Sequence, residues 1–141
     1  MQGYRFFAFG GAASHDISDG ILEQEEKRRI RLYYKLDKDF RIRNRNWWEA
    51  EMPSEEEMRH GMEILEKYHY DVDFVLSHCC TLRAASLCSE EKFTEDTLTR
   101  YFDQLLENGL QFKAWLFGHY HGNKKVMEKY FLLYEQIIRL I

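Results

Sequence analysis

The chain lacks any apolar run of about 18 residues, the length that a membrane-spanning helix needs. Residues 1–20 also lack the charged and then apolar pattern of a signal peptide. We therefore expect a cytoplasmic protein that has no membrane partner.

A positive net charge is absent as well. Lys and Arg number 20 against 24 Asp and Glu, and the formal net charge of −4 gives no global basic field to attract nucleic acid or an anionic membrane. The local basic run at residues 27–31 has Glu23, Glu25 and Glu26 beside it. We interpret this run as the solvated face of a helix, and we expect no nucleic-acid partner.

Cysteine is scarce, and proline is limited to Pro53. The three cysteines are an odd number, and Cys79 and Cys80 are adjacent, which does not suit a framework of disulfides. Buried free thiols are the favoured interpretation. The alternative is a thiolate metal ligand at Cys79, which lacks the Cys-x-x-Cys spacing that commonly accompanies such ligands. The hydrophobic content of 45% in 141 residues is enough for one domain, residues 1–141, with a real core.

Hydrophobic patterning predicts an α/β protein. Strands are expected where short apolar or aromatic runs end at turn residues, and helices where apolar residues recur every three or four positions. The expected strands are 4–9, 72–77, 114–117, 130–134 and 136–141. The expected helices are 54–68, which opens with a capping box of Ser54 and Glu57, and a second one from Thr94 to Asn108 and Gly109. The charged segment 17–45 contains the pattern of one short helix around Ile30 and Tyr33.

Histidines follow two of the expected strands. His78 ends one strand, and His119 and His121 follow Gly118 at the end of another, where the glycine lets the backbone turn. Neighbouring strands lie about 5 Å apart, so the three imidazoles can converge at one edge of a sheet, and imidazole is the commonest metal ligand. Asp16 is the only carboxylate at a comparable strand end, and a role in structuring its loop is favoured over a ligand role.

Four ordered motifs carry a resemblance to a known family. They are Gly-Gly-Ala-x-Ser-x-Asp, Trp-Trp-x-x-Glu-x-Pro-Ser-x-Glu-Glu, Val-Asp-Phe-Val-x-Ser-His and Trp-x-Phe-Gly-His-Tyr-His, at residues 10–16, 47–57, 72–78 and 115–121. In this order they resemble the calcineurin-like metallophosphoesterases, and more narrowly the small bacterial phosphoesterases of that family. The resemblance covers nearly the whole chain.

The resemblance implies a helix-flanked β-sandwich of the four-layer αββα type, with two divalent metal ions (Mn, Zn or Fe) at its rim. It implies hydrolysis of a phosphoester by a hydroxide that bridges the metals. The strand-end histidine of the family falls on His78, and its Gly-His-x-His pair falls on His119 and His121. By this carry-over His78 and His119 bind one metal, and His121 binds the other.

The chain also departs from the family. The motifs Asp-x-His, Gly-Asp-x-x-Asp and Gly-Asn-His-Asp/Glu, which supply the bridging aspartate and the catalytic histidine, are absent. Cys80 and Thr81 stand where relatives often place Ala-Pro. The chain therefore resembles the C-terminal portion of the family domain, an incomplete sandwich. We expect weakly held metals and little or no hydrolysis unless a partner chain supplies the missing ligands.

Three interpretations of function stay open. Besides a hydrolase completed by a partner, the chain suits a non-catalytic remnant that dimerises, or a phosphate- or nucleotide-binding module. In the last case Arg41, Arg43 and Arg45 would act beside Trp47 and Trp48, although a solvated edge strand is the alternative explanation of these arginines. Strands built to pair with an absent half leave apolar surface open, so we expect a homodimer.

Overall fold

A computed structural model describes residues 3–88 and 94–140 of the chain. Contacts divide it into two compact units. The larger unit combines Met1–Ala12 with Pro53–Ile141, and the smaller unit is Ala13–Met52. All three histidines that were singled out belong to the larger unit.

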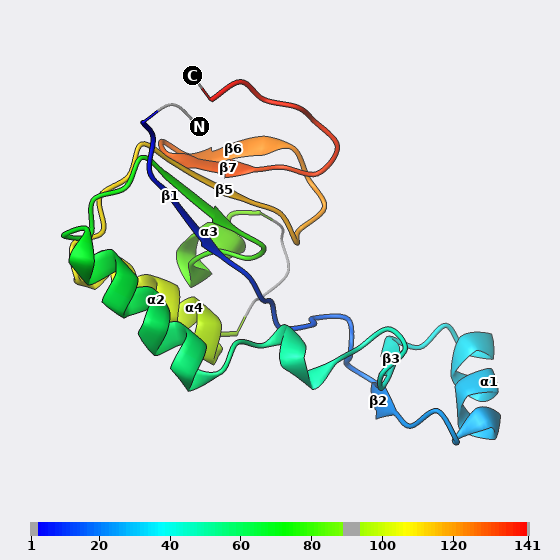
Figure 1. The fold of residues 1–141 in the computed structure, drawn as a ribbon. Coiled ribbons are helices and arrows are strands. Elements are labelled where there is room, and N and C mark those ends of the chain that lie inside the picture. Colours follow the sequence, from blue (N-terminus) through cyan, green and yellow to red (C-terminus); the bar gives the residue numbers. More distant parts are fainter. Residues whose placement is uncertain (1–2, 89–93, 141) are drawn as a thin grey trace. The chain divides into compact units, whose positions relative to one another are not determined.

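A five-stranded sheet forms the centre of the larger unit (Figure 1). Its order is β1-β4-β5-β7-β6, and all neighbours are parallel except β6 and β7, which are antiparallel. The strands are β1 (Phe6–Phe9), β4 (Phe74–Ser77), β5 (Ala114–Phe117), β6 (Lys124–Met127) and β7 (Tyr130–Leu132). This mostly parallel sheet with helices confirms the expected α/β class.

Helices α2 (Glu55–Lys67) and α4 (Thr97–Glu107) lie on one side of this sheet (Figure 1). The capping box predicted for α2 is present, because the Ser54 side chain accepts from the Glu57 backbone N–H and the Glu57 side chain accepts from the Ser54 N–H. The start predicted at Thr94 is wrong for α4. Asp96 is the N-cap instead, since its carboxylate accepts two backbone N–H groups of the first turn.

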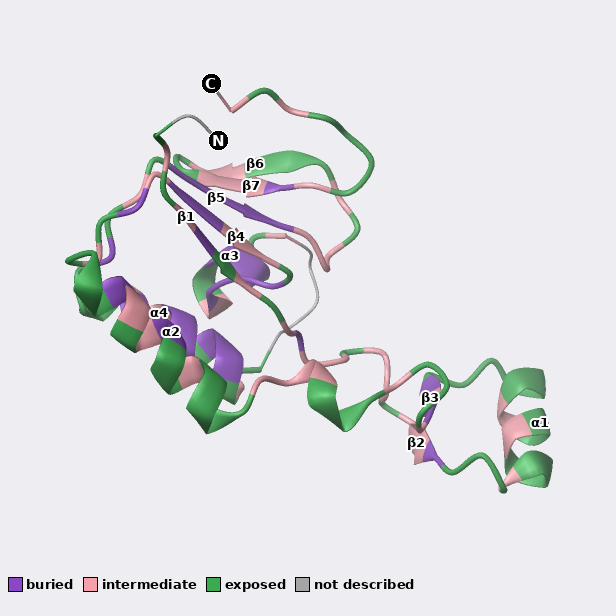
Figure 2. Cartoon of the chain, viewed as in Figure 1, coloured by how far each residue is buried: buried purple, intermediate pink, exposed green. Residues whose placement is uncertain are grey.

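The core between these helices and the sheet is aromatic. Trp115 of β5 is fully buried, and the ring of Phe102 on α4 contacts it edge to face at 5.2 Å between centroids. Phe9 of β1 packs against Tyr101 at 4.8 Å. Figure 2 shows β5 buried along its whole length, which explains why its sequence is apolar at every position rather than alternating.

The opposite face of the sheet carries a second apolar cluster. Its buried members are Phe74, Ala114 and Leu116, and its partly buried members are Tyr4, Phe6, Leu76, Phe131, Leu133, Ile138 and Leu140. The strand predicted at 136–141 is wrong, because residues 136–140 form no strand and Ile138 and Leu140 pack onto this cluster instead. Residue 141 lies outside the described residues. The fifth strand of the sheet is β6, which the patterning missed.

The smaller unit has its own cluster of apolar side chains. Strands β2 (Gly20–Leu22) and β3 (Phe40–Ile42) pair in parallel and supply its buried residues, and Ile30 and Tyr33 of α1 (Lys27–Lys35) pack against them. A single turn of 3-10 helix, Glu49–Glu51, follows. The short helix expected around Ile30 is confirmed. Strand β2 escaped the sequence analysis because three residues are too few for a recognisable alternation. The edge strand considered for Arg41, Arg43 and Arg45 is present only in part, since β3 ends at Ile42.

Candidate functional site

The candidate site lies at the C-terminal ends of two neighbouring parallel strands. Ser77 of β4 is aligned with Phe117 of β5, so the next residues, His78 and Gly118, leave the sheet side by side. The backbone N–H of Gly118 donates to the carbonyl oxygen of His78 at 3.0 Å, which extends the ladder by one step. Both strands therefore deliver a histidine to the same edge of the sheet.

The structure brings the side chains of His78 and His119 together. Nε2 of His78 lies 3.2 Å from Nδ1 of His119, and the ring centroids are 5.0 Å apart with planes inclined at 69°. His119 reaches this position with a positive φ of 69°, in the left-handed region of the backbone. Two ring nitrogens this close either share one proton or present two lone pairs to a common ligand.

His121, the third candidate ligand, has a different environment. It is exposed, its φ is 44°, and its ring packs against Tyr134 at 5.1 Å between centroids. Across residues 3–88 and 94–140, no group of three or more His, Cys, Asp or Glu side chains is placed to hold a metal ion. Among these residues, the candidate site therefore consists of a pair of nitrogen donors.

Asp16, the carboxylate weighed as a further ligand, pairs with Arg41 inside the smaller unit. This contact joins the loop after β1 to β3. It agrees with the structural role that the sequence favoured for Asp16.

A hydrogen-bond chain that the sequence analysis missed holds the backbone on both sides of His78. Nε1–H of Trp115 donates to Oγ of Ser77 at 2.7 Å, and the Ser77 hydroxyl donates to the carbonyl oxygen of Cys79. The signal in the sequence was a serine directly before the strand-end histidine. Its partner could not be found without the register of β4 against β5.

Of the three thiols after His78, those of Cys79 and Cys80 are buried and that of Cys88 is partly buried. Cys79 is 3% exposed, and burial, with a smaller contribution from Asp96, raises its pKa to about 12. Burial, followed by the neighbouring thiols Cys88 and Cys79, raises the pKa of Cys80 further. Burial also raises the pKa of Cys88 to about 11. All three cysteines are free, and Cys79 and Cys80 match the favoured interpretation of buried free thiols. The burial of Cys79 disfavours its thiolate form.

Two of the three arginines considered for a phosphate site, Arg41 and Arg43, pair with carboxylates. Arg41 pairs with Asp16, and Arg43 pairs with Glu23 at 2.8 Å and lies over the ring of Trp47 at 4.8 Å. A phosphate would have to displace these partners. The geometry therefore disfavours the phosphate-binding interpretation of this segment.

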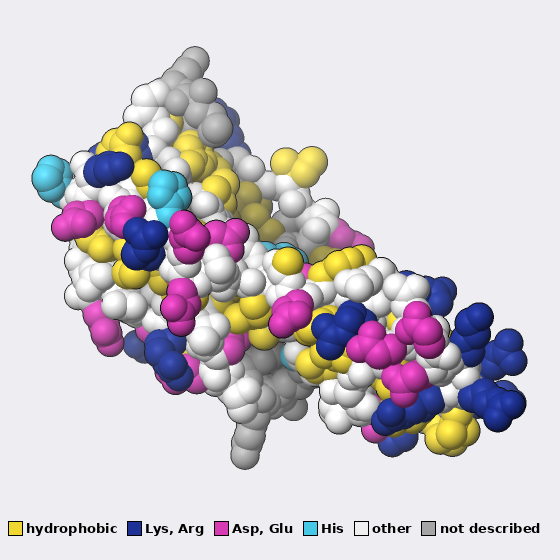
Figure 3. Space-filling model, turned by 60° about the horizontal axis from the view of Figure 1, so that its bottom comes forward, with side chains coloured by type: hydrophobic (Ala, Val, Ile, Leu, Met, Phe, Trp, Pro, Cys, Tyr) yellow, Lys and Arg dark blue, Asp and Glu magenta, His cyan; other side chains and the backbone are white. Residues whose placement is uncertain are grey.

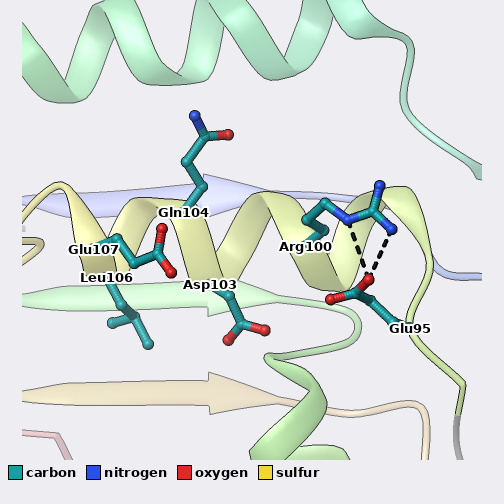
Figure 4. Close-up of a pocket in the computed structure, with 6 residues that line it drawn as sticks. All are labelled: Glu95, Arg100, Asp103, Gln104, Leu106 and Glu107. Carbon is teal, nitrogen blue, oxygen red and sulfur yellow. Dashed lines mark hydrogen bonds and ion pairs between the residues drawn. The ribbon is translucent and has the colours of Figure 1, made fainter.

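A surface hollow on α4 is also unsuited to an anionic substrate. Figure 4 shows its six lining residues, which are Glu95, Arg100, Asp103, Gln104, Leu106 and Glu107. Its single cation, Arg100, donates two hydrogen bonds to Glu95. Partial burial, reinforced by the nearby glutamates, raises the pKa of Asp103. None of the candidate histidines lines this hollow.

Comparison with protein-family models, with curated proteins and with solved structures finds no match for the chain. Within the described parts of the chain, no helix has both the length and the apolar character that crossing a membrane would require.

Proposed function

We propose that this chain supplies part of the metal site of a divalent-metal-dependent phosphoesterase. His78 and His119 are its ligands to one metal ion, and His121 is its ligand to a second. The remaining ligands come from another polypeptide segment, so the chain alone hydrolyses phosphoesters slowly or not at all. The observation that carries this proposal is the 3.2 Å separation between Nε2 of His78 and Nδ1 of His119 at the ends of adjacent strands.

The separation of the two nitrogens fits a shared metal ion. Nitrogen ligands bind zinc at about 2.0–2.1 Å, so two ligands of one ion lie about 3 Å apart. A pair of imidazoles suits zinc or iron better than manganese, which prefers oxygen ligands. Because the described residues provide two converging donors and no third, we expect weak affinity.

The residues of this chain would hold a metal ion and orient its histidine ligands, but they do not complete the catalytic site. A divalent ion bound at the pair supplies Lewis acidity toward a phosphoryl oxygen and lowers the pKa of bound water. The hydrogen bonds from Trp115 to Ser77 and from Ser77 to Cys79 keep His78 turned toward His119. No carboxylate of the described residues joins the pair, which supports low activity of the isolated chain.

The proposal extends to the architecture and to self-association. The apolar sheet face around Phe74 and Leu116 would pack against a second sheet in a four-layer αββα sandwich. In the absence of that sheet, we propose that the chain forms a homodimer.

A second candidate function is a non-catalytic protein that dimerises and binds one metal ion through His78 and His119. It is favoured by the absence, in the part of the chain that the structure describes, of any cluster of three or more potential ligands. Both functions share the histidine pair. They differ in whether a second polypeptide that supplies the remaining ligands would produce phosphoester hydrolysis.

Zinc titration by isothermal calorimetry tests the shared part of the proposal. We expect wild-type protein and His60→Ala, a change at an exposed histidine of α2, to bind zinc equally. His78→Ala and His119→Ala should each weaken binding by at least about tenfold, because a lone imidazole remains. Equal binding by wild type and the double variant would overturn the proposal.

Hydrolysis of a generic phosphodiester with Mn²⁺ or Zn²⁺ tests the second part. We expect the isolated wild-type chain and His78→Ala to hydrolyse the phosphodiester equally slowly or not at all. Enzyme-like turnover by the isolated wild type, lost in His78→Ala, would contradict the view that the site is incomplete.

A further inference from the structure

The helix α1 concentrates positive charge in the smaller unit. Its nine residues include five Lys or Arg and no acidic residue. Of the glutamates that neighbour this run in the sequence, only Glu26 forms an ion pair with a cation of α1 among the described residues. Glu23 pairs with Arg43, and Glu26 accepts from the Glu23 backbone N–H and pairs with Arg29. The run is therefore not neutralised in the way that its sequence neighbourhood suggested.

Four cations of α1 have no acidic partner within residues 3–88 and 94–140. They are Lys27, Arg28, Arg31 and Lys35. The opposite side of the helix is fixed, because Ile30 and Tyr33 pack against the apolar cluster of the smaller unit. With 3.6 residues per turn, Arg28, Arg31 and Lys35 point away from that cluster, whereas Lys27 is exposed at the flank, three residues before Ile30. Figure 3 shows Lys and Arg side chains gathered over α1.

Two leucines share this outward side. Leu32 lies one turn after Arg28 and is 51% exposed, and Leu36, which caps the helix, lies one turn further and is 56% exposed. Leucines exposed beside cations can enter the boundary with the acyl chains of a bilayer while the cations stay among the lipid headgroups. We define the α1 outer face as Arg28, Arg31, Leu32, Lys35 and Leu36.

We propose that the α1 outer face docks onto the surface of an anionic lipid bilayer. The cations lie against the lipid phosphates and carboxylates, and the leucines enter the boundary with the acyl chains. A nucleic acid would satisfy the cations but leave Leu32 and Leu36 in water, so the exposed leucines favour lipid. The net charge of −4 on the whole chain does not oppose contact at α1, because screening confines charge effects to about 8 Å at physiological salt. This inference is independent of the histidine pair.

Co-sedimentation with vesicles tests the proposal on the full chain. We expect wild type to bind vesicles rich in phosphatidylserine and to remain free with vesicles of phosphatidylcholine alone. The triple variant Arg28→Gln/Arg31→Gln/Lys35→Gln should bind the anionic vesicles on the order of 100-fold more weakly, since each basic residue near such a surface contributes about tenfold or less. Arg59→Gln, at an exposed arginine of α2, is the matched control and should bind as wild type does.

The variant Leu32→Ser/Leu36→Ser separates lipid from nucleic acid. We expect it to weaken vesicle binding while leaving any binding to a duplex oligonucleotide unchanged. Equal binding to anionic and neutral vesicles would overturn the proposal. So would unchanged vesicle binding by both the triple variant and the double leucine variant. Oligonucleotide binding that exceeds vesicle binding and depends on the three cations would assign the face to nucleic acid instead. Circular dichroism should show unchanged helix content in every variant, because the substituted side chains lie outside the core.

Discussion

The indole Nε1–H of Trp115 donates a 2.7 Å hydrogen bond to Oγ of Ser77, the residue immediately before His78. Trp115 is fully buried in the aromatic core. The bond therefore ties the buried aromatic core of the larger unit to the strand end that presents the histidine. Through this contact, the packing of Trp115 helps to position His78, the candidate ligand that follows Ser77.

We predict that Ser77→Ala both destabilises the protein and weakens zinc binding. The buried indole N–H would lose its acceptor, which costs about 1–3 kcal/mol. Urea unfolding measures the stability, and calorimetric titration measures the affinity. Ser86→Ala is the control, because Ser86 is exposed and its hydroxyl donates only to the Leu82 carbonyl oxygen within α3 (Leu82–Ser86). Unchanged zinc affinity in Ser77→Ala would show that this hydrogen bond does not position His78.

The sequence predicted the parts of the fold that depend on local patterns. The apolar run of β5 and the capping box at Ser54 were placed correctly, since neighbours in the chain decide both. Strand β6 was missed because Lys124 and Lys125 give it a polar surface, and only its pairing with β7 makes it a strand. The tail around Ile138 was misread, because its apolar residues pack on a sheet face without joining the sheet.

The candidate site also has a part that the sequence predicted and a part that it did not. Adjacent strand ends made the approach of His78 to His119 predictable, since parallel strands end at one edge of a sheet. The separate environment of His121 beside Tyr134 depends on positive φ values at residues 119 and 121, which no pattern of residue types announces.

A close contact between α2 and α4 leaves no room for a side chain at Gly61. A Cβ at this position would lie 2.3 Å from the Tyr101 hydroxyl oxygen and 3.0 Å from a ring carbon of Phe9. We predict that Gly61→Ala lowers the free energy of unfolding by about 1–3 kcal/mol through overpacking, although alanine favours a helix by about 1 kcal/mol. Urea unfolding measures the change.

Tyr101→Phe provides the matched test of this contact. The Tyr101 hydroxyl is buried and has no hydrogen-bond partner among the described residues, and burial raises its pKa. Removing it should leave stability unchanged or higher. In that background we expect Gly61→Ala to lose less stability than in wild type. Additive effects of the two substitutions would contradict the proposed clash.

Asp73 should make stability depend on acid pH. Its carboxylate accepts from Lys113 Nζ at 2.6 Å and from the Arg5 backbone N–H at 2.8 Å, and these bonds hold its pKa below the usual value. Because the pKa of Asp73 is lower in the folded state, its ionised carboxylate stabilises the folded protein at pH values above the pKa of the unfolded state. This stabilisation is lost as the pH falls through the pKa of Asp73 in the folded state.

We therefore predict that Asp73→Asn is less stable than wild type at neutral pH and that the difference shrinks in acid. Urea unfolding across the acid range provides the measurement. Glu128→Gln, at an exposed carboxylate, is the control and should follow the wild-type curve. A difference between Asp73→Asn and wild type that persists at the lowest pH would mean that the loss is not electrostatic.

The two edges of the five-stranded sheet differ in how they resist association. Strand β6 carries Lys124 and Lys125, whereas β1 contains neither proline nor charge. Because the Arg5 carbonyl oxygen accepts from the Phe74 N–H, the alternation of a parallel ladder turns the backbone groups of Phe6 and Ala8 outward. An aromatic edge with outward N–H and carbonyl groups suits pairing with another strand.

We predict that the protein is a homodimer in which the β1 strands of two copies pair in antiparallel fashion about a twofold axis. Light scattering after size-exclusion chromatography at micromolar concentration should give the dimer mass for wild type. Ala8→Lys, at an exposed position of the edge, should give monomer, because two lysines would face each other across the axis. Glu128→Lys adds the same charge in the turn between β6 and β7 and should remain dimeric. A monodisperse wild-type monomer would rule out this dimer, and a dimer that survives Ala8→Lys would move the interface from the β1 edge to the apolar sheet face.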